Sequence, residues 1–151
     1  MTIICKSNTS ESSPLILPRN NECNACSGDI VASSEWYTIN SNISGYSISM
    51  GREYTVYGIL YYDRQVRYLI LDDYGMPGFF PSTLFQLQKR NLFFEWEIGE
   101  YSIGEQTLFI IAYPDICHSY DNLLRLVEAK SDAISNFIRN KDYIDRLDFY
   151  R

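Results

Sequence analysis

The sequence lacks the features that mark several large classes of protein. No stretch of its 151 residues is apolar for long enough to span a bilayer, and the N-terminal residues MTIICKSNTS carry no basic leader of the secretory type. It also has no glycine-rich phosphate-binding motif. We therefore expect a cytoplasmic protein that holds no cofactor.

Positive charge is also scarce. The chain has 13 Lys and Arg against 19 Asp and Glu, which gives a net charge of −6 and a pI of about 4.7. Proteins that bind nucleic acid or anionic lipid rely on Lys and Arg to neutralise phosphates, so this balance argues against both partners. A cationic protein partner stays open, and so does simple solubility as the reason for the acidity.

Metal-binding residues are few. The four cysteines are Cys5, Cys23, Cys26 and Cys117, and the only CxxC motif, Cys23 to Cys26, has no second motif to complete a zinc site. A redox CxxC precedes a helix in a βαβ unit, and no such unit is visible. We expect no metal site and reduced thiols in a cytoplasmic chain.

What the sequence does have is aromatic residues, at 15%, and strand-forming runs. Three consecutive strands are predicted at Arg52 to Tyr62, Val66 to Leu71 and Phe79 to Leu87, because Tyr, Thr, Val and Ile suit a pleated surface. Asp63-Arg64-Gln65 and Asp72-Asp73-Tyr74-Gly75 supply turn chemistry between them. Pro81 has no backbone donor and places the third strand at a sheet edge or bend.

Further strands are predicted on both sides of this meander. They are Thr2 to Cys5, Asn91 to Glu97, and a buried strand at Leu108 to Tyr113. The glycines at 99 and 104 predict a loop or hairpin over Ile98 to Ile103.

Apolar residues fall at helical spacing from Asp121 onward. Two helices capped by Asp121 and Ser131 are one interpretation, and one long helix with a kink near Ala129 to Asp132 is the other. The sequence therefore predicts a single α+β domain over residues 1–151. It consists of an antiparallel SH3-like or half-barrel sheet, followed by a C-terminal helix or helices that pack on the sheet. Its parts are an irregular segment (1–45), a β-rich body (46–114) and a helical segment (119–148).

A span without Lys or Arg, from Arg90 to Arg125, interleaves acidic and aromatic residues. Such a surface attracts a cationic protein, and its aromatic residues slow release. A solvated sheet edge, whose charges discourage aggregation, is the alternative. Together with the acidic turn, the span gives these candidate partner-binding residues: Asp72, Asp73, Tyr74, Glu95, Trp96, Glu97, Glu100, Tyr101 and Glu105.

Catalytic signals are weak. His118 is the only histidine, and Cys117 and Ser119 beside it are nucleophile candidates by residue type alone, because nucleophile and base must meet through the fold. The pair Asp72-Asp73 lacks the spacing of a calcium loop and fits a turn equally well. We predict no catalytic residues and no enzymatic activity.

The segments GREYTVYGILYYDRQVRYLILDDYG and PGFFPSTLFQL resemble a pattern in small bacterial proteins, with Phe94-Glu95-Trp96 and DNLLRLVEAKSDAISNF fitting it further along. The pattern is similar to that of immunity proteins encoded beside polymorphic or contact-dependent growth inhibition toxins. It covers about residues 50 to 138, and the N-terminal segment with the CxxC lies outside it.

This resemblance implies a non-catalytic protein that binds and blocks one toxin domain. An acidic immunity protein suits a nuclease toxin, because the surface that binds nucleic acid is basic. Two alternatives stay open: an SH3-like module that binds peptides, and a hydrolase that uses His118 or a carboxylate pair.

Overall fold

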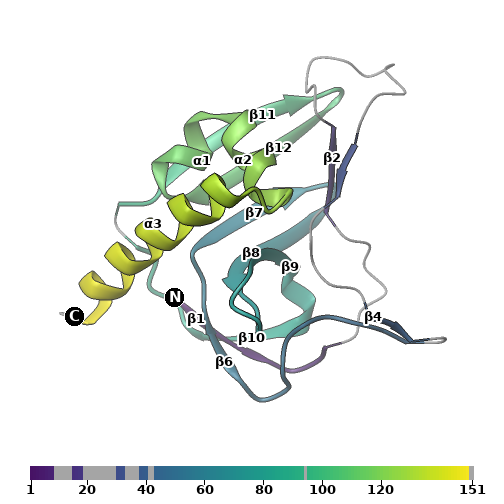
Figure 1. Cartoon of the computed structure of the whole chain (residues 1–151), viewed down its shortest axis with the longest axis vertical. Coiled ribbons are helices and arrows are strands. Elements are labelled where there is room, and N and C mark those ends of the chain that lie inside the picture. Colours follow the sequence, from purple (N-terminus) through teal and green to yellow (C-terminus); the bar gives the residue numbers. More distant parts are fainter. Residues whose placement is uncertain (9–14, 19–29, 33–37, 41–42, 94, 150–151) are drawn as a thin grey trace.

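The computed structural model describes residues 1–8, 15–18, 30–32, 38–40, 43–93 and 95–149. Over these ranges the chain forms antiparallel sheets followed by helices, which is the α+β class that the sequence predicts (Figure 1). The two larger sheets stay open and do not close into a barrel. Two short hairpins accompany them: β2 (Ile16–Pro18) with β3 (Ile30–Ala32), and β4 (Thr38–Asn40) with β5 (Ile43–Gly45).

A five-stranded sheet forms the middle of the molecule, in the order β11-β12-β7-β8-β9. Its strands are β7 (Gly58–Tyr62), β8 (Gln65–Leu71), β9 (Pro77–Pro81), β11 (Glu97–Ile103) and β12 (Gln106–Ala112). All neighbours are antiparallel. Successive side chains of each strand therefore point to opposite faces of the sheet, and the two faces pack against different layers.

One face is covered by the helices, which are α1 (Pro114–His118), α2 (Tyr120–Val127) and α3 (Ser131–Phe149). Leu60, Leu69 and Ile110 are fully buried there. They pack in one cluster with Leu123 of α2 and Phe137 of α3. Figure 1 shows the three helices gathered on this side of the sheet.

The opposite face is covered by a smaller sheet in the order β10-β1-β6. Its strands are β1 (Thr2–Cys5), β6 (Glu53–Thr55) and β10 (Phe85–Lys89). Ile70 of β8 and Phe80 of β9 pack against Ile3 and Phe85 of this sheet in a second cluster. The smaller sheet thus covers the β8–β9 end of the central sheet.

Turn chemistry explains the meander that the sequence predicts. Asp63 and Arg64 both have positive φ, 49° and 59°, as the two central residues of a type I′ hairpin turn require. Gly75 has a φ of 77° in the β8–β9 turn. Strand β9 contains Pro77 and Pro81 and lies at the sheet edge, which confirms the position expected for a proline-bearing strand.

Two predicted strands are each divided by the structure. Arg52 to Tyr62 becomes β6 and β7, and residues 56–57 carry the chain from the smaller sheet to the central one. Phe79 to Leu87 becomes β9 and β10, which are separated by the 3₁₀ helix η1 (Ser82–Leu84). Continuous β propensity does not reveal the point at which a chain changes sheets.

The region before β12 corrects one expectation and decides another. No strand runs from Asn91 to Glu97 among the described residues there. Of the two alternatives for Ile98 to Ile103, a loop or a hairpin, the structure has the hairpin, because Glu97–Ile103 is a regular strand paired with β12. Gly104 occupies the hairpin turn with a φ of 64°, and Gly99 lies inside β11, where a Cβ atom would sit 2.5 Å from the carbonyl oxygen of Cys117.

The helices follow the first of the two interpretations. Ala129, with a φ of 55°, separates α2 from α3, so there are two C-terminal helices and no single kinked one. The cap of α2 is Ser119, whose side chain accepts from the backbone N–H of Asn122, and the cap predicted at Asp121 is wrong by two residues. The short helix α1 was not expected.

The Cys23 to Cys26 motif lies outside the described residues. Cys5 and Cys117 are buried free thiols. No helix in the described part of the chain combines the length and apolar character that a membrane crossing requires.

Gly99→Ala is expected to destabilise the fold. The new methyl group would approach the backbone of Cys117 at 2.5 and 2.8 Å, and backbone cannot move aside as a flexible side chain can. The free energy of unfolding should fall by about 1–3 kcal/mol in urea denaturation. Ser102→Ala, on the exposed side of the same strand, is the control and should change it by less than about 0.5 kcal/mol. Equal effects of the two variants would contradict the close approach of α1.

Candidate functional site

The β11–β12 end of the central sheet carries side chains that no described layer covers. Strand register brings Glu100 opposite Phe109, Phe109 opposite Tyr61, and Tyr61 opposite Val66. Ile98 lies opposite Ile111 in the neighbouring row. We call this set the uncovered face: Tyr61, Val66, Ile98, Glu100, Phe109 and Ile111.

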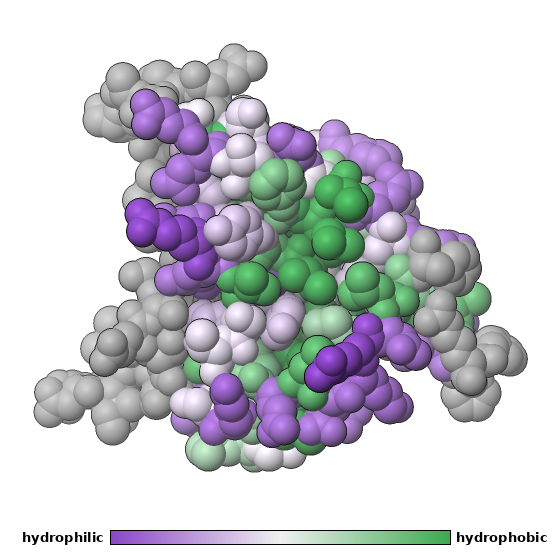
Figure 2. Space-filling view, turned by 180° about the vertical axis from the view of Figure 1, so that it is seen from behind, coloured by the Kyte–Doolittle hydropathy of each residue, from purple (hydrophilic) through white to green (hydrophobic). Residues whose placement is uncertain are grey.

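The uncovered face is largely apolar and accessible. The exposed fraction is 71% for Ile98, 43% for Tyr61 and 41% for Phe109. Seen from the side opposite the helices, Figure 2 shows apolar side chains gathered at the centre of the surface with polar residues around them. Contiguous exposed apolar surface on a folded protein marks a site of interaction.

Local sequence explains why this face is apolar on both sides of the sheet. In the run LFIIA of β12, Leu108 and Ile110 point to the helices and are fully buried. Phe109 and Ile111 alternate with them and point to the other side. The cluster under the smaller sheet reaches Tyr68 of β8 and Ile59 of β7. It does not extend across β12, so Phe109 is exposed and Ile111 is half-buried.

Three of the candidate glutamates lie on the β11–β12 hairpin. Glu100 is exposed and belongs to the uncovered face. Glu105 is exposed in the hairpin turn, and Glu97 is paired with Nε2 of His118 on α1. Glu100 is therefore the carboxylate best placed to meet a partner on this face.

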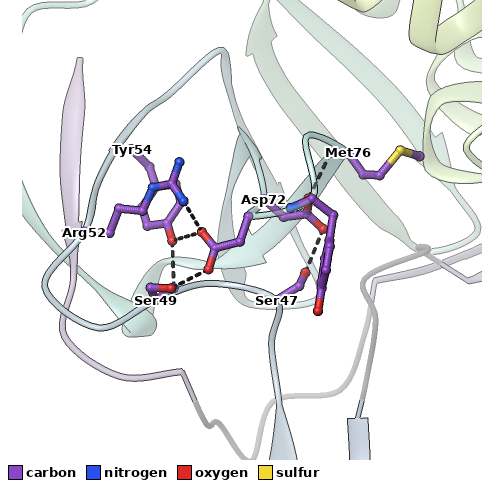
Figure 3. Close-up of polar contacts among 8 residues, drawn as sticks. Ser47, Ser49, Arg52, Tyr54, Asp72 and Met76 are labelled. Carbon is purple, nitrogen blue, oxygen red and sulfur yellow. Dashed lines mark hydrogen bonds and ion pairs between the residues drawn. The ribbon is translucent and has the colours of Figure 1, made fainter.

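Asp72 has a structural role in the β8–β9 turn. Its carboxylate accepts hydrogen bonds from the backbone N–H of Tyr74 and of Met76, both at 2.9 Å, and from the hydroxyl of Ser47 at 2.7 Å (Figure 3). Only 6% of the residue is exposed. A partner could not reach this carboxylate without opening the turn.

Asp73 is engaged in a second network beside it. The carboxylate accepts from Ser49 at 2.5 Å, from Tyr54 at 2.7 Å and from Arg52 at 2.8 Å (Figure 3). Burial raises the pKa of Asp73, but these three donors outweigh burial and hold the pKa below its ordinary value. The network ties the β8–β9 turn to the start of β6.

Strands β12 and β7 lie between β11 and this turn in the sheet order. The structure therefore does not unite the acidic candidates on one surface. Glu100 and Glu105 stay with the uncovered face, while Asp72 and Asp73 serve the fold at the opposite side of the sheet.

The aromatic candidates divide in the same way. Tyr74 is 79% exposed but lies beside Asp73. Trp96 is half-buried and packs against both clusters, and the hydroxyl of Tyr101 donates to the carbonyl of Ile116 at 2.8 Å. Glu95 accepts from the hydroxyl of Tyr143 on α3 at 3.0 Å. Trp96, Tyr101 and Glu95 therefore hold the β11 segment against the helices.

The residues around His118 do not form a nucleophile and base pair. The Cys117 thiol is buried, and its Sγ lies 3.3 Å from the carbonyl oxygen of Glu97 and 3.5 Å from that of Ala112. Burial raises the pKa of this thiol to about 11, which keeps it protonated at neutral pH. The Ser119 hydroxyl caps α2. Within the described residues, neither group forms a hydrogen bond with His118.

A pocket of about 210 Å³ lies among the three helices. Its charged walls are largely paired internally. Arg125 makes a two-point contact with Asp132 at 2.7 and 3.1 Å, and Asn136 donates to Asp115 at 2.6 Å. Among the described residues no group of three or more His, Cys, Asp or Glu could hold a metal ion.

Comparison of the chain with protein-family models, with curated proteins and with solved structures gives no match.

Sequence reasoning missed the apolar members of the uncovered face: Tyr61, Val66, Ile98, Phe109 and Ile111. The run LFIIAY was predicted as a buried strand, and that prediction gave no reason to expect exposed side chains on one of its sides. The available signal was the charge of β11, because a strand that carries Glu97 and Glu100 lies at a sheet edge with few neighbours.

The Asp73 network predicts a dependence of stability on pH. Because the folded-state pKa of Asp73 is lowered, its carboxylate stabilises the folded state above the unfolded value of about 3.9, and this contribution is lost as pH falls through the folded-state pKa. In urea denaturation, the stability difference between the parent protein and Asp73→Asn should be constant above about pH 5 and shrink toward pH 2. Ser49→Ala removes one of the donors that lower the folded-state pKa of Asp73, so in this background the loss should be smaller and should be complete at a higher pH. A difference that stays constant down to pH 2 would contradict the assignment.

Proposed function

We propose that the protein is an immunity protein that binds and neutralises a cognate bacterial toxin domain. It does so by placing the uncovered face over the active site or substrate groove of the toxin. The observation that supports this proposal is an exposed apolar sheet end with Glu100 among its side chains and Glu105 at its margin.

The chemistry of this face suits a cationic partner with apolar anchor points. Tyr61 and Phe109 offer rigid rings, whose immobilisation costs little conformational entropy and which bury a large area on contact. Glu100 stands directly opposite Phe109, so a Lys or Arg of the partner can pair with it while its stem packs on the ring. Tyr, Phe and Arg are the residue types enriched at protein interfaces.

The charge of the whole chain supports a nuclease as the target. The net charge of −6 raises the encounter rate with a basic surface. Nucleases need such a surface because their substrates are polyanions. Inhibition then follows from occupation of that surface and requires no chemistry from the immunity protein. The resemblance of residues 50 to 138 to immunity proteins points the same way.

The proposal is tested by co-expression with the product of the adjacent open reading frame, which is expected to carry the toxin domain, followed by affinity measurement. A stable complex and loss of nuclease activity are expected, and absence of a complex at micromolar concentration would contradict the proposal. Phe109→Ala should weaken the complex about tenfold or more. Leu87→Ala is the matched control, because Leu87 is a comparably exposed apolar residue on β10, which belongs to the other sheet.

Charge reversal separates the electrostatic part of this interaction. Glu100→Lys should slow association, and the effect should diminish as salt is raised, because salt screens attraction between exposed charges. Glu53→Lys on β6 makes the same change of net charge away from the uncovered face. If both variants slow association equally, net charge alone attracts the partner and the uncovered face has no special role.

A further inference from the structure

The uncovered face continues to an open strand edge. Strand β11 is the last strand of the central sheet, and no described strand pairs with its outer side. The other edge strand, β9, contains Pro77 and Pro81, which lack the backbone donor that a further strand would need. Strand β11 contains no proline over its seven residues. The two edges of the sheet thus differ in their capacity to accept another strand.

The hairpin turn fixes which backbone groups of β11 face outward. Ile103 and Gln106 flank the two-residue turn, with Gly104 at a φ of 64°. In such a hairpin the flanking pair exchanges both backbone hydrogen bonds, and bonded and non-bonded pairs then alternate along the ladder. Gly99, Tyr101 and Ile103 therefore direct their N–H and C=O groups toward β12.

It follows that Ile98, Glu100 and Ser102 direct their backbone groups away from β12, toward the open edge. Within the described part of the chain, these three residues take part in no backbone hydrogen bond outside the ladders. All three are exposed. By strand alternation their side chains share one side of the sheet, and that side is the uncovered face.

An added strand would thus extend the backbone ladder and the uncovered face together. Its side chains would stand beside Ile98, Glu100 and Ser102, at the distance of about 4.5–5.5 Å that separates cross-strand neighbours. An apolar residue beside Ile98 and a cation beside Glu100 would each stabilise the pair. This arrangement defines the sequence pattern of a matching segment.

Charge decides between a second copy of this chain and a different partner. The antiparallel register that pairs all three outward residues of two β11 strands places Glu100 directly opposite Glu100. Like charges in that position are destabilising, and each copy carries a net charge of −6. A segment with Lys or Arg at that position replaces this repulsion with an attraction.

We propose that an extended cationic segment of the partner adds to the outer edge of β11 as a further antiparallel strand, bonded to the backbone of Ile98, Glu100 and Ser102. This inference rests on the proposed function for the identity of the partner. It adds the mode of recognition, in which main-chain hydrogen bonds supply affinity and alternate side chains supply specificity.

The first test uses a synthetic probe and the full chain. The peptide carries Val and Lys in turn on one strand face with Thr between them, and the matched peptide carries Glu in place of Lys. Amide hydrogen exchange followed by NMR should slow at Ile98, Glu100 and Ser102 with the Lys peptide only. The amides of Gly99 and Tyr101, already bonded to β12, serve as internal controls and should not change. No slowing at the three outward amides, or equal slowing with the Glu peptide, overturns the proposal.

The second test removes one donor. Ser102→Pro eliminates an outward N–H without removing a bond to β12, and Ser102→Ala keeps the donor while removing the hydroxyl. Affinity for the Lys peptide should fall about fivefold or more for Ser102→Pro, which corresponds to one lost hydrogen bond, and should hardly change for Ser102→Ala. Unchanged exchange at Gly99 and Tyr101 verifies that the hairpin of the proline variant is intact. Equal affinities of the two variants overturn the proposal.

These outcomes are separable from the proposed function. A toxin complex that protects Phe109 but leaves the three outward amides unprotected keeps the immunity function and overturns strand addition. Failure of any toxin complex overturns the immunity function, and the Lys peptide then decides strand addition by itself. Slowing that depends on protein concentration without any peptide shows pairing between copies of this chain and also overturns the proposal.

Discussion

The unequal cover on the two faces of the central sheet determines the rest of this structure. On the helix side, α1, α2 and α3 bury the face against Leu60, Leu69 and Ile110. On the other side the cluster under the three-stranded sheet includes residues of β9 and β8 and Ile59 of β7, and no residue of β11 or β12. The side chains of β12 that point to the helices must be apolar, because they form the core. The side chains on its other side are apolar too, but the smaller sheet does not cover them. The hydrophobic effect makes such a surface a site for another molecule.

The acidic residues that stabilise the fold differ from the one that the proposed function uses. The carboxylates of Asp72 and Asp73 accept hydrogen bonds that close the β8–β9 turn and connect it to Ser47, Ser49 and Arg52. Glu100 has no such task and faces solvent on an edge strand. A charged edge residue has two compatible consequences: it discourages self-association, and it selects a cationic neighbour.

Parts of this fold could be predicted from the sequence because local chemistry specified them. The β7–β8 and β8–β9 turns follow from Asp63-Arg64 and from Gly75, and Pro77 with Pro81 accounts for an edge strand. The break between α2 and α3 at Ala129 lies where the helical pattern falters. By contrast, the sequence left a loop or a hairpin open over Ile98 to Ile103, because Gly99 resembles a strand breaker. Gly99 is needed because the backbone of Cys117 approaches it closely. This contact joins two separate segments of the chain, so a local sequence pattern cannot predict it.

The candidate site was harder to predict for a related reason. The positions of the carboxylates along the chain do not show which of them will accept hydrogen bonds within a turn and which will stay exposed on a sheet. Sequence alone also gives no account of where the smaller sheet ends, and that boundary is what leaves Tyr61 and Phe109 accessible. The sequence alone showed that the β11–β12 hairpin is acidic. The apolar residues beside Glu100 were identified only from the strand register of the structure.

The claim that the uncovered face is the binding surface is tested most directly by hydroxyl-radical footprinting of the protein with and without the toxin domain proposed as its partner. Aromatic side chains report their own solvent access, and the chain offers exposed ones on different elements: Tyr61, Phe109, Tyr74 and Tyr143. The account predicts loss of modification at Tyr61 and Phe109 with no change at Tyr74 and Tyr143. Protection of Tyr74 or Tyr143 while Tyr61 and Phe109 stay modified would contradict it.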